Sequence, residues 1–251
     1  MSIAFDFTNK IFLVTGATSG IGRQISCDIC SSGGKVIAVG RNDVALSKLK
    51  DRFGDHLYSV VTDLREETAV EMVQEAITCF GKIDGLVHAA GVSYNTPLRV
   101  FSAEKAHEIM DISFWSAVNL IQLVNKPKNH NRFCSYILFS SVAAYSGGKA
   151  LFAYAAAKSA VQSLARSFCK EIAKDGSRIN TISPGVIETE MTKRVDDKFG
   201  LSNAVKEGSL LGPGNVEDVS DMVKYLLSDN AKWITGQDYV VDGGYLLGGR
   251  E

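Results

Sequence analysis

The chain alternates short apolar runs with longer segments in which apolar residues recur at helical spacing. The clearest helical face carries Ala69, Met72, Val73, Ala76 and Phe80, which stand at positions i, i+3, i+4, i+7 and i+11. The apolar runs have the length of buried strands. They span Ile11–Thr15, Lys35–Val39, Leu57–Thr62, Asp84–His88, Ser135–Ser140, Arg178–Ser183 and Tyr239–Val241.

Further helices are expected from about Ile21, near Asp43, through Met110 to Leu120, and from Tyr154 to Ile172. Short apolar strands that alternate with helices indicate a parallel sheet covered on both faces. We therefore predict an α/β fold with seven parallel strands, doubly wound, as one domain over residues 1–251. No linker, repeat or low-complexity stretch divides it, and the polar segment Asn125–Arg132 is predicted to be a surface loop.

Composition excludes several classes of function. The 251 residues carry a net charge of −1, which argues against a general affinity for nucleic acid or an anionic membrane. No apolar run reaches the roughly 18 residues that a membrane span needs, and Met1–Lys10 lacks a signal-peptide layout, so we expect a cytoplasmic protein. Cys27 and Cys30 have redox spacing without a second pair, the four histidines lack metal-ligand spacing, and no metal is expected. His88, at the end of a strand, is expected to be structural.

The pair Tyr154 and Lys158 is the first candidate for chemistry. Residues four apart share a helix face, and a nearby cation lowers the pKa of a phenol from about 10. Such a phenol exchanges a proton with a substrate oxygen, which Ser141 could also hydrogen-bond. The same spacing also arises by chance, as in Tyr145 and Lys149, where two intervening glycines predict a loop.

A glycine-rich segment, Thr15–Gly22, follows the first strand and opens a helix. Glycines allow a tight turn and a close backbone approach to a pyrophosphate, and the helix N-terminus favours an anion. An ordinary strand–helix turn is the alternative. The residues expected to bind phosphate are Gly16, Thr18, Ser19, Gly20, Ile21 and Gly22.

The end of the second strand bears on the choice of nicotinamide cofactor. An acidic residue there would suit the ribose hydroxyls of NAD(H), but this chain has Gly40, Arg41 and Asn42. A guanidinium suits a 2′-phosphate, so Arg41 and Asn42 predict NADP(H), with NAD(H) less favoured. Arg23 is a second candidate for the phosphate, and either arginine could instead be an ordinary surface residue.

Taken together, these segments resemble the short-chain dehydrogenase/reductase superfamily, in its single-domain branch, over essentially the whole chain. The cofactor loop of that family matches Thr15–Gly22, and its catalytic set matches Ser141, Tyr154 and Lys158. The resemblance implies a Rossmann-type fold and a nicotinamide cofactor. Other matching segments are Thr62–Leu64, His88–Gly91, Asn180, Ser183–Thr189, Ile234–Gln237 and Val241–Gly244.

The resemblance also assigns cofactor contacts beyond the glycine loop. It implies that Asp63 holds the adenine, that Lys158 binds the nicotinamide ribose, and that Ile187 and Thr189 contact the carboxamide. The further residues expected at the cofactor are Asp63, Leu64, Ala90, Gly91, Tyr154, Lys158, Pro184, Gly185, Ile187 and Thr189.

The chain departs from the family pattern at two places. His88 and Ala89 stand where the family has a mainly structural pair of asparagines. Ser113 stands where the family has an asparagine that links the catalytic lysine through water to solvent. Two interpretations of Ser113 stay open: an added water completes the proton relay, or the relay is weakened and turnover is slow.

The expected reaction is hydride transfer between the nicotinamide and a carbonyl or secondary alcohol. The layout resembles 3-oxoacyl-carrier-protein reductases, which act on carrier-bound substrates, although sugar, polyol and steroid reductases share the motifs. A non-catalytic cofactor-sensing regulator is the alternative from another class. Residues 190–214 are expected to form a substrate lid. The resemblance further implies a homotetramer or homodimer that pairs through the helices Met110–Leu120 and Tyr154–Ile172, with Tyr245–Gly249 as another contact.

Overall fold

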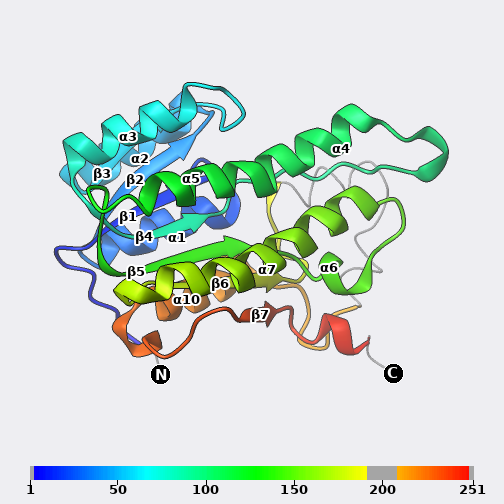
Figure 1. Cartoon of the computed structure of the whole chain (residues 1–251). Coiled ribbons are helices and arrows are strands. Elements are labelled where there is room, and N and C mark those ends of the chain that lie inside the picture. The colour runs from blue at the N-terminus through cyan, green and yellow to red at the C-terminus, as the bar shows by residue number, and fades with distance from the viewer. Residues whose placement is uncertain (1–2, 191–207, 249–251) are drawn as a thin grey trace.

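The computed structural model describes residues 3–190 and 208–248, which form one parallel sheet with helices on both faces (Figure 1). The strands are β1 (Ile11–Thr15), β2 (Lys35–Gly40), β3 (Leu57–Val61), β4 (Ile83–His88), β5 (His130–Phe139), β6 (Arg178–Pro184) and β7 (Asp238–Val241). Their order is β3-β2-β1-β4-β5-β6-β7, with every neighbouring pair parallel. The predicted α/β sheet is confirmed, and its direction of winding reverses between β1 and β4.

Helices connect successive strands and cover the sheet. The main ones are α1 (Gly20–Ser31), α2 (Asp43–Phe53), α3 (Ala69–Phe80), α4 (Ala103–Met110), α5 (Ser116–Val124), α6 (Ala143–Ser146), α7 (Phe152–Ile172) and α10 (Val216–Leu227). A π-helical turn, η3 (Asp111–Trp115), joins α4 to α5. Short 3-10 turns are η1 (Gly54–His56), η2 (Leu98–Val100), η4 (Ala173–Asp175), η5 (Asp229–Ala231) and η6 (Tyr245–Leu247).

Two apolar layers lie on opposite faces of the sheet. Ile25 of α1 and Val223 of α10 pack on one face, and Val73 of α3 and Val161 of α7 pack on the other. Side chains of each strand alternate between the layers, which is why the strands read as continuous apolar runs. None of the helices in the described ranges combines the length and apolarity that crossing a bilayer requires.

The predicted surface loop Asn125–Arg132 is wrong at its end, because β5 already begins at His130 and pairs there with Ile83. Asn129, just before the strand, is buried, and its amide donates to Leu123 O at 2.8 Å and to Gln74 Oε1 at 2.8 Å. The polar composition of this segment therefore reflects buried hydrogen bonds as well as exposure.

The predicted helix through Met110 to Leu120 is present, but it is not α-helical throughout. It contains the π-helical turn η3, in which the backbone N–H of Ser116 reaches back to Asp111 O. π-helical turns insert an extra residue and redirect the side chains that they carry. The turn η3 contains Ser113, one of the two positions at which the chain departs from the pattern of the family that it resembles.

Candidate active site

The glycine loop meets the end of β4 at the point where the winding of the sheet reverses. A Cβ atom on Gly16, whose φ is +67°, would lie 2.9 Å from the carbonyl carbon of Ala89 and from the backbone nitrogen of Ala90. A Cβ on Gly22 would lie 2.4 Å from Gly16 O. Only glycine permits these approaches, and they bring the first turn of α1 next to the segment that follows β4.

The first turn of α1 is suited to an anion. The side chain of its N-cap residue, Ser19, makes no capping hydrogen bond, and the turn contains no acidic residue. The backbone N–H groups at this end are therefore not taken by the helix's own cap. Thr189 closes the other side of the loop, since a Cβ on Gly20 would lie 3.4 Å from Thr189 Cγ2.

A cavity of about 210 Å³ lies between the glycine loop and the ends of β2, β3 and β4. Most of the residues predicted to bind cofactor line it: Gly16, Thr18, Ser19, Gly20, Ile21, Gly22, Arg41, Asp63, Leu64, Ala90, Gly91 and Thr189. Seven lining residues were not predicted to contact the cofactor, although two of them, Thr62 and Ala89, lie within matched segments: Val39, Gly40, Thr62, Ala89, Val92, Ile112 and Glu190. Most of these directly flank predicted motifs, so the signal that could have found them was the position of each strand end.

A second, wider cavity of about 1340 Å³ shares Thr18, Ser19 and Arg41 with the first. Arg23 and Asn42 also line this second cavity. The side chain of Asn42 accepts a hydrogen bond of 3.1 Å from the Ala45 N–H and so caps α2. The basic groups expected near a 2′-phosphate are thus gathered along one opening.

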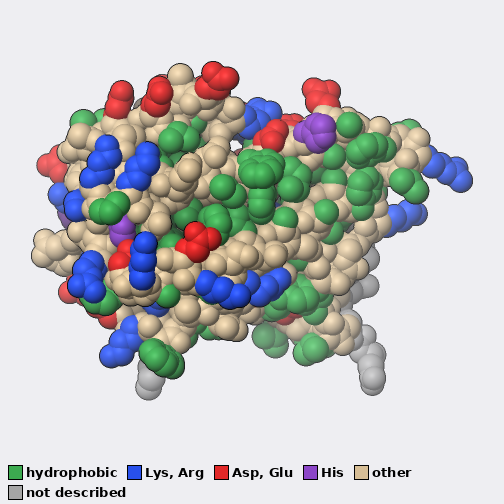
Figure 2. All heavy atoms as spheres, in the orientation of Figure 1, with side chains coloured by type: hydrophobic (Ala, Val, Ile, Leu, Met, Phe, Trp, Pro, Cys, Tyr) green, Lys and Arg blue, Asp and Glu red, His purple; other side chains and the backbone are tan. Residues whose placement is uncertain are grey.

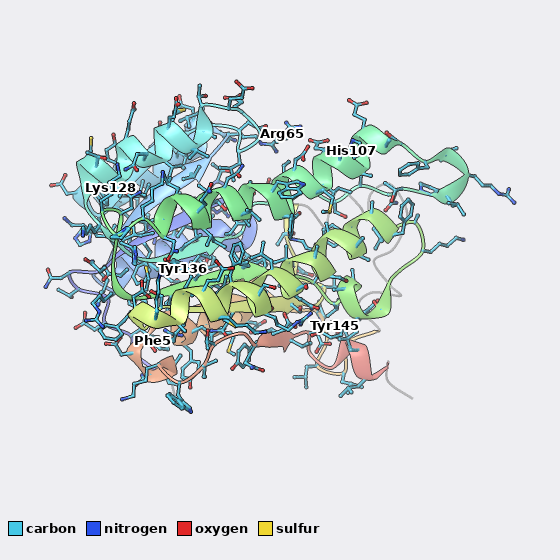
Figure 3. All side chains as sticks on the ribbon, viewed as in Figure 1. Phe5, Arg65, His107, Lys128, Tyr136 and Tyr145 are labelled. Carbon is cyan, nitrogen blue, oxygen red and sulfur yellow. The ribbon has the colours of Figure 1, made fainter. Side chains whose placement is uncertain are left out.

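Asp63 at the edge of the smaller cavity is held by two arginines. Arg65, labelled in Figure 3, binds it in a bidentate manner, at 3.0 Å and 2.7 Å, and also donates to Glu108 at 2.9 Å. Arg41 lies further off, with Nη1 3.6 Å from Asp63 Oδ2 and a side chain 59% exposed. The Arg65 hydrogen bond lowers the pKa of Asp63 to about 2, so the carboxylate is ionised at neutral pH.

Ser141, Tyr154 and Lys158 come together at the end of β5. Lys158 is 4% exposed, and its Nζ donates to Phe139 O at 2.8 Å and lies 5.6 Å from the ring centre of Tyr154. Ser141 hydrogen-bonds Tyr154. Tyr154 lies in the first turn of α7, where the helix dipole favours negative charge.

The pKa values of this group differ from the sequence expectation. Burial lowers the pKa of Lys158 to about 8. Burial also raises the pKa of Tyr154, and the hydrogen bond with Ser141 opposes that rise. Desolvation, and not the lysine cation expected from the sequence, is the main influence on the pKa of the phenol, because the protein withdraws water from it.

Ser141 is fixed by the elements around it. Its Oγ accepts from the Ala143 N–H at 3.2 Å, and the next residue, Val142, donates its N–H to Pro184 O at 3.1 Å. Ser140 Oγ donates to Lys158 O at 2.9 Å. The segment after β5 is therefore bound to both β6 and α7.

Ser113 lies close to this group. A Cβ on Gly91 would lie 3.5 Å from Lys158 Nζ and 3.9 Å from Ser113 Oγ, so both atoms face the space beside Gly91. Ser113 is 1% exposed, and its Oγ has no hydrogen-bond partner among the described residues. The buried hydroxyl and the buried ammonium thus lie beside the same small region next to Gly91.

Six of the predicted cofactor residues do not line the smaller cavity: Asn42, Tyr154, Lys158, Pro184, Gly185 and Ile187. Gly185 donates its N–H to Val241 O at 2.9 Å, and a Cβ there would lie 2.7 Å from Asp242 Cα. Ile187 is buried against the core that α10 covers. Most of the predicted lid, residues 191–207, falls outside the described residues.

The alternative pair Tyr145 and Lys149 is not a site of the same kind. Tyr145 lies in the short helix α6, which was predicted as a loop, and Gly147 with φ of +73° ends that helix. The phenol of Tyr145, which Figure 3 labels beside α6, donates to Asp238 at 2.6 Å. The intervening glycines therefore separate Tyr145 from Lys149, as predicted.

Comparison with protein families gives one match over residues 16–246, to the family described as enoyl-(acyl carrier protein) reductase. The 3-oxoacyl-[acyl-carrier-protein] reductase of Escherichia coli is 31% identical over 245 residues, which cover 96% of this chain and 99% of that protein. The reductase of the same name from Haemophilus influenzae is 33% identical over 241 residues, covering 95% and 98%.

Solved structures of dehydrogenases also match over nearly the whole chain. A short-chain glucose/ribitol dehydrogenase from Brucella melitensis matches with a TM-score of 0.90 at 27% identity, covering 97% of this chain and 99% of that one. A Beutenbergia cavernae protein proposed to be an NAD(P)-dependent gluconate 5-dehydrogenase, with NADP bound at low occupancy, matches at 0.90 and 28%, covering 98% and 100%. A 4-hydroxyisoleucine dehydrogenase in complex with NADH matches at 0.88 and 28%, covering 96% and 100%.

Proposed function

The chain belongs to the short-chain dehydrogenase/reductase family, and from that premise we propose that it is an NADP(H)-dependent ketoreductase acting on carrier-bound 3-oxoacyl substrates. Membership makes it an NAD(P)-dependent oxidoreductase of carbonyl and CH–OH groups. The observation that carries the proposal is the group formed by half-buried Ser141, half-buried Tyr154 and buried Lys158 beside the cofactor cavity.

In the proposed mechanism the protein transfers one proton to the substrate and positions the carbonyl oxygen that receives it. The nicotinamide cofactor supplies the hydride to the carbonyl carbon when it is bound. Tyr154 donates its phenolic proton to the carbonyl oxygen as that oxygen gains electrons, and Ser141 holds the same oxygen by a hydrogen bond. The product is an alcohol, and the reverse sequence oxidises it.

Lys158 and Ser113 are proposed to return the proton to Tyr154. The depressed pKa of Lys158, about 8, lets its ammonium group give up a proton near neutral pH. Ser113 Oγ faces the same space, and a hydroxyl can accept and donate at once. An intervening water would complete this relay toward solvent, and a slow relay is the alternative outcome.

The preference for NADP(H) is proposed from Arg41. Arg65 is held by the carboxylates of Asp63 and Glu108, whereas Arg41 approaches Asp63 only at 3.6 Å. Arg41 can therefore turn to a 2′-phosphate without losing a close ion pair, and Arg23 lines the same opening. Structural neighbours bind either NADP or NADH, so the preference depends on these arginines.

Substrate class is proposed from the relatives, which are 3-oxoacyl-[acyl-carrier-protein] reductases over nearly the full chain. The glucose/ribitol and gluconate dehydrogenases among the structural neighbours make a sugar or polyol the second candidate. NADPH oxidation should be measured with acetoacetyl-coenzyme A, ketose sugars and a cyclic ketone. Turnover with the thioester alone supports the proposal, turnover with ketoses alone assigns the sugar class, and no turnover with any of them favours a cofactor-sensing regulator.

Association into dimers or tetramers is proposed through α5 and α7. Figure 2 shows hydrophobic side chains gathered over this face, where Trp115 is 53% exposed and Phe152 is 45% exposed. Apolar side chains of this size on one face are typical of protein interfaces. Leu247, 85% exposed in η6, would serve the second contact predicted near the C-terminus. Sedimentation velocity at several concentrations tests this assignment.

A further inference from the structure

We propose that His88 is a positioning residue for the proton relay: its imidazole, protonated on Nε2, holds the π-helical turn that carries Ser113 to the end of β1. The proposal rests on the function proposed above. From the sequence, His88 was expected to be merely structural.

The hydrogen bonds of His88 fix its tautomer. Nε2 lies 3.1 Å from Ile112 O, and a carbonyl oxygen only accepts, so Nε2 carries the hydrogen. Nδ1 lies 3.0 Å from Thr15 Oγ1 and must then accept. Thr15 Oγ1 in turn accepts from the Ala90 N–H at 3.1 Å, which leaves its own proton for Nδ1.

These bonds form a one-directional chain across the site. It runs from the Ala90 N–H through the Thr15 hydroxyl and the His88 ring to the carbonyl of Ile112. Thr15 ends the strand that leads into the glycine loop, and Ile112 lies in η3. The histidine therefore connects the cofactor loop to the turn that carries Ser113.

The Ile112 carbonyl is held from two sides. Ser116 Oγ also donates to it, at 2.6 Å, while the Ser116 N–H is bonded to Asp111 O in the π-helical pattern. Two hydrogen bonds to this carbonyl fix the orientation of the peptide plane between Ile112 and Ser113. That plane sets the direction of Ser113, whose buried Oγ lies beside Gly91, as Lys158 Nζ does.

His88 acts on the relay without carrying charge in it. The ring is 2% exposed, and burial lowers the pKa of His88 to about 4, with the nearby Lys158 acting in the same direction. The N–H of this neutral imidazole is donated to Ile112 O, and its other nitrogen accepts from Thr15, so neither nitrogen is available to exchange a proton with Lys158. Its effect on turnover must therefore pass through the position of Ser113.

The two departures from the family pattern, His88 and Ser113, thus lie on one hydrogen-bonded unit. The ring of His88 bonds the carbonyl of the residue just before Ser113. The imidazole of His88 is long enough to bridge Thr15 and Ile112. The hydroxyl of Ser113 is shorter than the amide that the family carries there, so its direction depends more strongly on a fixed backbone. We infer that the two residues work as a pair.

A double-mutant cycle on kcat tests the pair in the full chain. We expect His88→Leu and Ser113→Ala each to lower kcat for NADPH-dependent reduction about 10- to 100-fold, with the Kd for NADPH changed less than about threefold. In the Ser113→Ala background, His88→Leu should lower kcat no further. His88→Gln, whose amide can donate to Ile112 O, should recover part of the loss, and His107→Leu on the exposed side of α4 should change nothing.

Additive losses in kcat would overturn the proposal, because a residue that acts only on folding does not couple to Ser113. Nitrogen-15 spectra of the imidazole give a second test that does not depend on turnover or on a leucine variant that folds. Protonation of His88 on Nδ1, in place of Nε2, would also overturn it. A wild-type chain that reduces no carbonyl would instead refute the proposed function, and active wild type with additive losses would refute only the role of His88.

Discussion

The ammonium group of Lys158 donates a hydrogen bond of 2.8 Å to the carbonyl oxygen of Phe139, the last residue of β5. Ser140 Oγ returns a bond of 2.9 Å to the backbone carbonyl of Lys158. Together these bonds fasten α7 to the end of β5, so Ser141 and Tyr154 meet although thirteen positions separate them in sequence. Lys158 is therefore a structural tie as well as a source of charge.

Replacing Tyr154 with phenylalanine removes the proposed proton donor and little else. We expect kcat to fall about 10²- to 10⁴-fold, because that is the usual contribution of a positioned general acid. The Kd for NADPH, measured by fluorescence titration, should stay within about threefold. Tyr145→Phe is the matched control, since its phenol bonds Asp238, and it should keep nearly full turnover. Activity retained in Tyr154→Phe would refute the assignment.

Replacing Arg41 with glutamine should weaken NADPH binding selectively. A charge-assisted hydrogen bond contributes about 1.5–3 kcal/mol, so the KM for NADPH should rise about 10- to 100-fold while that for NADH changes little. Arg132→Gln, on β5 far from the cavities, is the control. A wild-type chain that binds NADH more tightly than NADPH would contradict the cofactor assignment before any variant is made.

The sheet and the positions of its strands could be predicted because burial on both faces produces continuous apolar runs. The errors fell where another force competes with that pattern. The start of β5 at His130 was read as a loop because Asn129 beside it is polar, although its amide is buried and fully bonded. The break at η3 left no trace in apolar spacing, because π-helical and α-helical turns differ in hydrogen bonding and not in composition.

At the site, the residues that belong to sequence motifs could be predicted from the sequence. Residues that act only through hydrogen bonds to distant segments could not. Gly16, Arg41 and Tyr154 were predicted from local patterns and lie at or beside the cavity. His88 was set aside because a lone histidine after a strand has no pattern of its own. Its contacts with Thr15 and Ile112 join segments far apart in the chain, and only the fold brings these together.

Acid should destabilise the protein through His88. Its pKa is about 4 in the folded chain and about 6.5 when unfolded, so the unfolded state binds the proton first as pH falls. The stabilisation is complete above pH 6.5 and is lost toward pH 4, by up to about 3 kcal/mol. Urea unfolding of the wild type between these values should show the loss, and His88→Gln should show much less of it. Equal pH dependence in both proteins would contradict the assignment.

Replacing Ser113 with asparagine restores the amide that the family carries at this position. We expect turnover to hold or rise, because the amide extends further toward Lys158 Nζ and offers both a donor and an acceptor. Steady-state kinetics with NADPH and the best substrate of the panel provide the measurement. A large drop in kcat, in a variant that unfolds at the wild-type temperature, would count against Ser113 as the relay position.

The glycine loop predicts a difference between two glycines with nearly the same backbone angle. Gly16 has φ of +67° and Gly147 has φ of +73°, so alanine strains the backbone similarly at both, by about 1 kcal/mol. A Cβ at Gly147 meets nothing within 4 Å, whereas one at Gly16 lies 2.9 Å from the backbone of Ala89. The free energy of unfolding should therefore fall by roughly 1–3 kcal/mol more in Gly16→Ala than in Gly147→Ala. Gly16→Ala should also lose most of its affinity for NADPH, because the loop must move away from β4. Equal stability and equal NADPH affinity in the two variants would show that this contact does not shape the cofactor site.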